Sequence, residues 1–179
     1  MQRHIVVVTG ASGAGKTATV RALAQRGLPG IACFEFDTVG VPALDVMERE
    51  YGSGEAWQAA MTREWLERLW NAPDAPCVSV LDAQTRPTFV LEGADAVGGP
   101  SVRIVLFECS AVVRSARLRR GRQQPELDTS RMDAWADFLH AEAAQLGLPI
   151  VDTSALTLVE ARERLEALVV EMRDSAPAR

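Results

Sequence analysis

The chain has 179 residues and a formal net charge of −5, with 47% apolar and 24% charged residues. This composition is typical of one globular domain, and it excludes collagen-like, disulfide-scaffold and extensively disordered chains. The negative charge also argues against a general binder of nucleic acid or anionic membranes. No apolar run approaches the roughly 18 residues that span a bilayer. We therefore expect a single domain over 1–179, soluble and cytoplasmic, with no membrane or nucleic-acid partner.

Short β-branched runs alternate with longer helical patterns along the chain. Strands are predicted at 4–8, 31–36, 77–81, 102–107 and 150–151. Helices are predicted at 16–26, 42–51, 55–70, 86–97, 111–120, 131–146 and 158–172, with a loop at 121–130 and a frayed end at 175–179. This alternation predicts βαβ units and a parallel sheet covered by helices on both faces. Ligands of such sheets bind outside the carboxyl ends of the strands.

A glycine-rich segment follows the first predicted strand. Residues 10–17 read GASGAGKT and match GxxxxGK[ST], which marks a phosphate-binding loop where it follows a buried strand and opens a helix. Glycines let backbone N–H groups converge on phosphate oxygens, and the helix N-terminus adds partial positive charge. The residues expected to bind nucleotide are Gly10, Ser12, Gly13, Ala14, Gly15, Lys16 and Thr17. Lys16 would reach the β- and γ-phosphates, and the Thr17 hydroxyl would ligate Mg²⁺. The alternative is a chance glycine-rich turn.

The loop, the chain length and the predicted strand order resemble the P-loop small-molecule kinases. This superfamily includes adenylate, shikimate and gluconate kinases and chloramphenicol phosphotransferase. The resemblance implies a three-layer α/β fold with a five-stranded parallel sheet in the order 2-3-1-4-5. It also implies ATP as phosphoryl donor, an acceptor-binding segment at about 38–75 and a mobile lid at about 118–130. The family's loop after the last strand contacts adenine, mostly through its backbone, which points here to Asp152, Thr153 and Ser154, with Ser154 as the expected binding residue.

Two acidic residues follow predicted strands at the edge that carries the phosphate loop. A carboxylate there can orient an attacking hydroxyl and accept its proton, and Asp37 resembles the carboxylate of the sugar, shikimate and chloramphenicol kinases. Asp82 ends the third strand and could hold the Mg²⁺ shell through water. The alternative for both is a cap on the following segment. Glu35 should point to the other face of its strand.

Arginines gather in two places. Arg86 follows Asp82 by four residues, as in adenylate kinases, where such an arginine grips an acceptor or transferred phosphate. Five arginines lie within nine residues, namely Arg114, Arg117, Arg119, Arg120 and Arg122. Lids of this family supply arginines to the transferred phosphoryl group, and we favour Arg117 and Arg120 for that catalytic role. A solvated arginine-rich surface is the alternative in both places.

The segment between Asp37 and Trp70 is acidic and aromatic. It carries seven carboxylates against three arginines, and it includes Tyr51, Trp57 and Trp65. A pocket for a nucleoside monophosphate would need the opposite charge. We therefore expect a neutral or cationic acceptor with an apolar or ring-shaped part. The alternative is that the acids are solvated and the tryptophans belong to the core.

The sequence thus predicts an ATP-dependent kinase that phosphorylates a hydroxyl group of a small molecule, with antibiotic inactivation as one use. The alternatives are a nucleotide or nucleoside kinase, and a regulatory nucleotide-binding module. A switch GTPase would carry an NKxD-type guanine motif, which the sequence lacks. Cys33, Cys77 and Cys109 lie in apolar runs without metal-ligand spacing. We therefore expect all three cysteines to act as small, buried hydrophobic residues. The sequence leaves the oligomeric state open.

Overall fold

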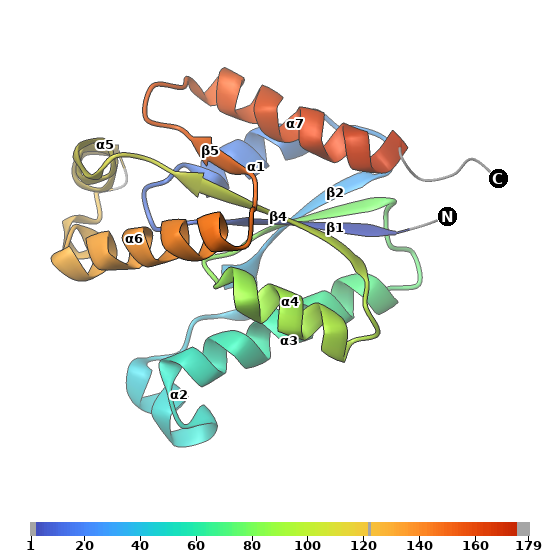
Figure 1. Cartoon of the computed structure of the whole chain (residues 1–179), viewed down its shortest axis with the longest axis horizontal. Helices are drawn as coiled ribbons and strands as arrows, with labels where there is room; N and C mark the ends of the chain where they lie inside the picture. The colour runs from blue at the N-terminus through green and yellow to red at the C-terminus, as the bar shows by residue number, and fades with distance from the viewer. Residues whose placement is uncertain (1–2, 122, 175–179) are drawn as a thin grey trace.

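The strands form one parallel five-stranded sheet in the order β2-β3-β1-β4-β5 (Figure 1). The structure is a computed structural model that describes residues 3–121 and 123–174. The strands are β1 (His4–Thr9), β2 (Ile31–Glu35), β3 (Val78–Asp82), β4 (Ser101–Glu108) and β5 (Ile150–Asp152). The predicted strands and the predicted strand order are therefore confirmed. The segments 1–2 and 175–179 lie outside the described residues, as does Arg122.

Helices connect the strands and end close to the predicted positions. They are α1 (Lys16–Ala24), α2 (Leu44–Tyr51), α3 (Gly54–Asn71), α4 (Pro87–Ala96), α5 (Ala111–Ala116), α6 (Ser130–Gln145) and α7 (Leu158–Asp174). The Ser53 hydroxyl accepts a hydrogen bond from the Ala56 N–H and so caps α3. Pro87 opens α4, where its missing N–H costs no helical hydrogen bond.

The helices pack on both faces of the sheet, which makes three layers (Figure 1). Along β1, Ile5 and Val7 face the core under α3 and α4, whereas Val6 and Val8 face the core under α1 and α7. Every residue of β1 is buried, because side chains alternate between two covered faces. The loop that follows β1 is thereby fixed at the middle of the carboxyl edge of the sheet.

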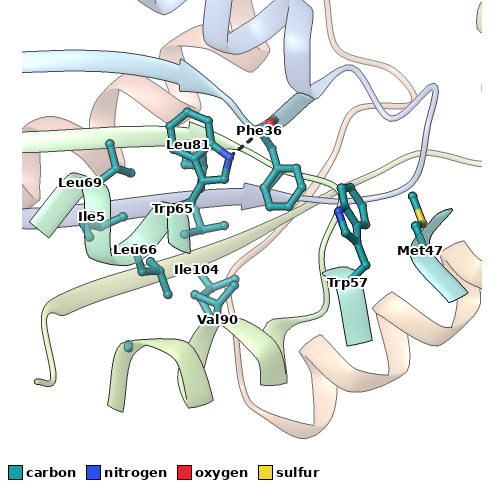
Figure 2. Close-up of a cluster of buried hydrophobic side chains, with 13 residues drawn as sticks. Ile5, Phe36, Met47, Trp57, Trp65, Leu66, Leu69, Leu81, Val90 and Ile104 are labelled. Atoms are coloured by element: carbon teal, nitrogen blue, oxygen red, sulfur yellow. Dashed lines mark hydrogen bonds between the residues drawn. The ribbon is translucent and has the colours of Figure 1, made fainter. Parts of the chain in front are cut away.

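Two tryptophans of the acidic segment belong to the core under α3 (Figure 2). The Phe36 and Trp57 rings meet edge to face, with centroids 6.1 Å apart. The Trp65 indole Nε1–H donates to the Phe36 carbonyl oxygen at 3.2 Å. Trp57 and Trp65 are buried, whereas Tyr51 is exposed. These tryptophans hold the chain at the end of β2 and are not free to line an acceptor pocket.

Three local features differ from the prediction. The predicted helix at 111–120 ends at Ala116, and a π-helical turn, Arg117–Gly121, follows it. The predicted loop at 121–130 contains a 3₁₀ turn, Pro125–Leu127. The second strand stops at Glu35, and a 3₁₀ turn, Phe36–Val39, takes the chain away from the sheet.

Among the described residues, the cysteines form no disulfide, and one of the three is buried. Cys109 is buried, whereas Cys33 and Cys77 are half-buried, which corrects the expectation that all three are core residues. Burial raises the pKa of the Cys33 thiol to about 11. A high thiol pKa keeps Cys33 protonated at neutral pH and therefore unreactive.

Both described ends of the chain lie at the amino edge of the sheet, opposite the phosphate loop (Figure 1). His4 begins β1 there, and α7 ends at Asp174 on the same side. Among the described residues, no helix is both long and apolar enough to cross a bilayer.

Candidate active site

The loop after β1 is packed so tightly that glycine is needed at two of its positions. Gly10 and Gly13 have φ values of 148° and 85°, which favour glycine. A Cβ on Gly10 would lie 2.1 Å from the Phe107 carbonyl oxygen, and one on Gly13 would lie 2.9 Å from Cγ of Arg114. The loop is therefore pressed against the end of β4 and against α5, and its shape is fixed by backbone contacts.

Lys16 is the first residue of α1, and its side chain folds back over the loop. It is buried, and Nζ donates to the carbonyl oxygens of Gly10 at 2.8 Å and Ala11 at 3.2 Å. The first turn of α1 contains no acidic residue. An ammonium group beside the N-terminus of a helix suits the β- and γ-phosphates of a nucleotide. The residues present thus fit the phosphate groups that the sequence motif predicts.

The carboxyl ends of β2 and β3 bring two carboxylates to the same edge. Asp82 is buried, and burial raises its pKa. The charge of Lys16 and a hydrogen bond with Thr17 act in the opposite direction and lower this pKa. Asp37 is exposed and close enough that its charge also raises the pKa of Asp82. Glu35 pairs with Arg21 at 2.7 Å, and its charge also raises the pKa of Asp82, with which it is in register.

Thr17 and Asp82 supply oxygen ligands of the kind that Mg²⁺ prefers. Within residues 3–121 and 123–174, no group of three or more His, Cys, Asp or Glu side chains could hold a metal ion. An ion here would therefore complete its shell with phosphate oxygens and water, which is usual for Mg²⁺ bound with a nucleotide.

A cavity of about 520 Å³ adjoins the phosphate loop. Its lining comprises Gly13, Gly15, Lys16, Thr17, Ala18, Thr19, Arg21, Arg117, Gly121, Thr153, Leu156, Thr157, Leu158 and Ala161. The lining includes no carboxylate, and Leu156 and Leu158 make it partly apolar. A cavity of this size and chemistry suits a nucleotide with its base away from the loop.

Thr153, rather than Ser154, lines this cavity. The buried Thr153 hydroxyl lies 2.9 Å from the Ala14 carbonyl oxygen, to which it donates. Ser154 is half-buried, and its Oγ accepts a hydrogen bond from the Ser110 N–H at 2.8 Å. Thr153 lies in the segment expected to contact adenine, but its contact with the phosphate loop was not predicted, because that contact joins residues 139 positions apart.

Arg117 bridges the phosphate loop and the segment after β5. Its guanidinium donates to the Gly13 carbonyl oxygen at 3.3 Å, and to Oγ1 and the carbonyl oxygen of Thr153 at 2.8 Å each. It also lines the first cavity. The structure thus places Arg117 beside the predicted nucleotide site.

The other arginines of this cluster have different surroundings. Arg114 is buried and pairs with Asp133 of α6, and Arg119 pairs with Asp128. The Arg119–Asp128 pair joins the start and the end of the predicted lid, and the Arg114–Asp133 pair joins the segments that flank it. Arg120 is exposed and lines neither cavity described here.

A second cavity, of about 750 Å³, lies between the start of α3, the β3–α4 connection and α6. Its lining comprises Gly54, Glu55, Gln58, Gln84, Arg86, Glu126, Leu127, Thr129, Arg131, Met132, Ala134, Trp135 and Phe138. Gln84 connects it to the phosphate loop, because its Oε1 accepts from the Ser12 hydroxyl at 2.9 Å. Of the predicted acceptor segment at 38–75, only Gly54, Glu55 and Gln58 line this cavity.

Arg86 lines the second cavity, and its guanidinium forms an ion pair with Glu55. Its Nη1 lies 2.7 Å from Oε1 of Glu55. Its guanidinium also lies over the rings of Phe89, Trp135 and Phe138, with distances to the ring centroids of 5.2, 5.9 and 4.7 Å. Sequence reasoning missed this cluster because α3, α4 and α6 each contribute to it from a different part of the chain.

Comparison with known proteins bears on the fold. The sequence matches no protein-family model and no curated protein. The structure resembles a tunicamycin resistance protein from Deinococcus radiodurans, with a TM-score of 0.65, 23% identity and coverage of 94% of this chain and 96% of that one. A gluconokinase from Sinorhizobium meliloti has a TM-score of 0.61 and 19% identity, over 98% of this chain and 100% of that one. A shikimate kinase from Acinetobacter baumannii has a TM-score of 0.59 and 14% identity, over 99% of this chain and 97% of that one.

These similarities extend over nearly the whole chain, and they agree with the order of the strands in the sheet. The chain therefore has the three-layer α/β fold of the P-loop small-molecule kinases.

Proposed function

We propose that this protein transfers the γ-phosphoryl group of ATP to a hydroxyl group of a small molecule, with Mg²⁺ as the metal. The observation that carries the proposal is a hydrogen bond between the phosphate loop, which borders the first cavity, and the wall of the second cavity. Ser12, in the phosphate loop, donates to Gln84 of the second cavity at 2.9 Å. A nucleotide in the first cavity and an acceptor in the second would therefore meet at the loop. The kinases among the structural neighbours support this reading.

In the proposed reaction the acceptor oxygen attacks the γ-phosphorus, and the bond to the β–γ bridging oxygen breaks. Lys16 would hold the β- and γ-phosphates, while Thr17 and Asp82 would hold Mg²⁺ directly or through water. Asp37 would orient the acceptor hydroxyl and take its proton. Arg117 and Arg120 would offset the charge that develops on the transferred group.

The proposed acceptor is neutral or cationic, because the segment at 37–70 has an excess of carboxylates. Inactivation of an antibiotic is one use of such a reaction. One structural neighbour is a tunicamycin resistance protein, so we include antibiotics among the proposed acceptors.

The test is release of ADP from ATP and Mg²⁺ in the presence of a panel of acceptors. The panel should contain sugars, gluconate, shikimate, nucleosides, nucleoside monophosphates, tunicamycin and chloramphenicol. We expect ADP release to depend on one class of acceptor and the product to gain one phosphoryl group by mass spectrometry. ATP turnover that no acceptor changes would instead indicate a regulatory nucleotide-binding module.

Lys16→Ala is the matched control for this assay. We expect it to fold, by circular dichroism, and to lose acceptor-dependent transfer, because the clamp on the phosphates contributes to binding and to the transition state. Near-normal turnover in Lys16→Ala would contradict the proposal.

A further inference from the structure

The Arg86 guanidinium is already engaged on more than one side within the second cavity. Glu55 pairs with Nη1 at 2.7 Å, and Phe138 lies under the guanidinium at 4.7 Å from ring centroid to Cζ. Nε of Arg86 is buried and has no hydrogen-bond partner among the described residues. An anionic group that binds Arg86 must therefore displace the Glu55 carboxylate or lie beside it. An anionic ligand that lies beside the Glu55 carboxylate would be repelled by it, because both groups are negatively charged.

Formal charges in the lining of the second cavity balance. Two carboxylates, Glu55 and Glu126, face two guanidinium groups, Arg86 and Arg131. Among the described residues, Glu126 and Arg131 form no ion pair, whereas Glu55 contacts Arg86 directly. Arg86 is the less exposed cation, with 26% of its side chain accessible. The Glu55 carboxylate thus decides whether the cavity offers a positive charge to a ligand.

Polar groups without charge remain in the cavity beside this pair. Gln84 uses its Oε1 to accept from Ser12, and Gln58 uses its Nε2 to donate to the Gln84 carbonyl oxygen at 2.7 Å. The Gln84 amide nitrogen and the Gln58 amide oxygen make no hydrogen bond within the described part of the chain, so both can pair with a ligand. A donor and an acceptor of this kind suit hydroxyl groups.

We propose that Glu55 is a specificity-determining residue, which makes the second cavity a site for uncharged hydroxyl compounds and excludes carboxylates and phosphates. The inference rests on the proposed function in treating this cavity as the acceptor site, and it narrows the acceptor to an uncharged molecule. Gluconate and shikimate, which carry carboxylates, are then expected to fail as acceptors, as are nucleoside monophosphates.

The test compares two ligands of nearly equal shape, D-gluconate and D-glucitol, which differ in a carboxylate against a hydroxymethyl group. Binding is measured by calorimetry with the phosphate loop occupied by Mg·ADP. Wild type should bind gluconate no more tightly than glucitol. Glu55→Gln keeps the side-chain shape and removes the charge, and it should bind gluconate at least about tenfold more tightly than wild type does, because charge-assisted hydrogen bonds are the strong ones.

Two further variants locate the effect. Glu126→Gln removes the same charge from the same cavity without exposing Arg86, and its gain in gluconate affinity should be much smaller. Glu55→Gln combined with Arg86→Met should lose the gain altogether. Glu55 is exposed over 56% of its side chain, so Glu55→Gln should fold.

The proposal is overturned if wild type prefers gluconate, if Glu55→Gln gains no affinity for it, or if Glu126→Gln gains as much. The measurement involves no turnover. It therefore fails or succeeds independently of phosphoryl transfer, which the release of ADP tests.

Discussion

The position of Asp37 is set by the residue before it. The Phe36 side chain is buried against Trp57, and its carbonyl oxygen accepts the Trp65 indole N–H (Figure 2). Asp37 is the next residue, and it is exposed at the edge that carries Lys16 and Asp82. A carboxylate held from behind by a rigid core is suited to orient a substrate, because little of its freedom is lost on binding.

Asp37→Asn keeps the shape of this side chain and removes the proton acceptor. We expect kcat to fall by roughly 10²–10⁴, the usual range for a positioned general base. A loose transition state would place the loss at the low end of that range. Affinity for ATP should barely change. The kcat is measured by steady-state kinetics with an identified acceptor, and the ATP affinity is measured by calorimetry. Unchanged kcat would remove Asp37 from the mechanism, and lost ATP binding would make it a metal-binding or structural residue.

Gly10 should be the glycine least tolerant of substitution. In Gly10→Ala, the new Cβ would lie 2.1 Å from the Phe107 carbonyl oxygen. The backbone would also keep a φ of 148°, which is unfavourable for alanine. We expect the free energy of unfolding to fall by about 2–4 kcal/mol. Gly27→Ala is the matched control, because Gly27 has φ of 60° and open space around it. That control should lose only about 1 kcal/mol. Urea denaturation of both variants tests the difference, and equal losses would show that contact with Phe107 is unimportant.

Among the elements, the π-helical turn after α5 carries arginines with different surroundings. Arg117 contacts the phosphate loop, whereas Arg120 is exposed. We expect Arg117→Ala to lower kcat and also to weaken ADP binding by about tenfold, since it loses hydrogen bonds from a charged group. Arg120→Ala should lower kcat and leave ADP affinity unchanged, because its charge would meet only the transferred group.

Calorimetry of ADP and steady-state kinetics on both variants test this expectation. Arg119→Ala serves as the comparison, since Arg119 is committed to Asp128. Small and equal effects on kcat in all three variants would favour the solvated-surface alternative for these arginines.

The sequence predicted elements well where the signal is local. Apolar runs marked the strands, and the phosphate loop was recognisable because its glycines, lysine and threonine are consecutive. The Glu55–Arg86 pair and the Arg117–Thr153 contact were not predictable, because each joins elements that are distant in sequence. The π-helical turn was also missed, because residues 111–121 carry a helical pattern throughout and the departure follows from packing: Leu118 is fully buried and Arg117 reaches the loop.

At the scale of the whole molecule, nucleotide binding should stabilise the fold, because the first cavity joins residues of α1, the π-helical turn and the segment before α7. At an ADP concentration of 100 times Kd, the stabilisation is about 2.7 kcal/mol. For a chain of this length we expect Tm to rise by roughly 5–10 °C. Thermal unfolding with and without Mg·ADP provides the measurement, and Lys16→Ala should show a much smaller rise. An unchanged Tm for wild type would argue against a nucleotide in this cavity.

The placement of the described chain ends at the amino edge of the sheet has a practical consequence. His4 and Asp174 lie on the side opposite the phosphate loop (Figure 1). A fluorescent label or a surface tether attached near either residue would start on the side opposite both cavities. Immobilisation from that side, for single-molecule or biosensor experiments, would therefore leave the carboxyl edge of the sheet open to ligands.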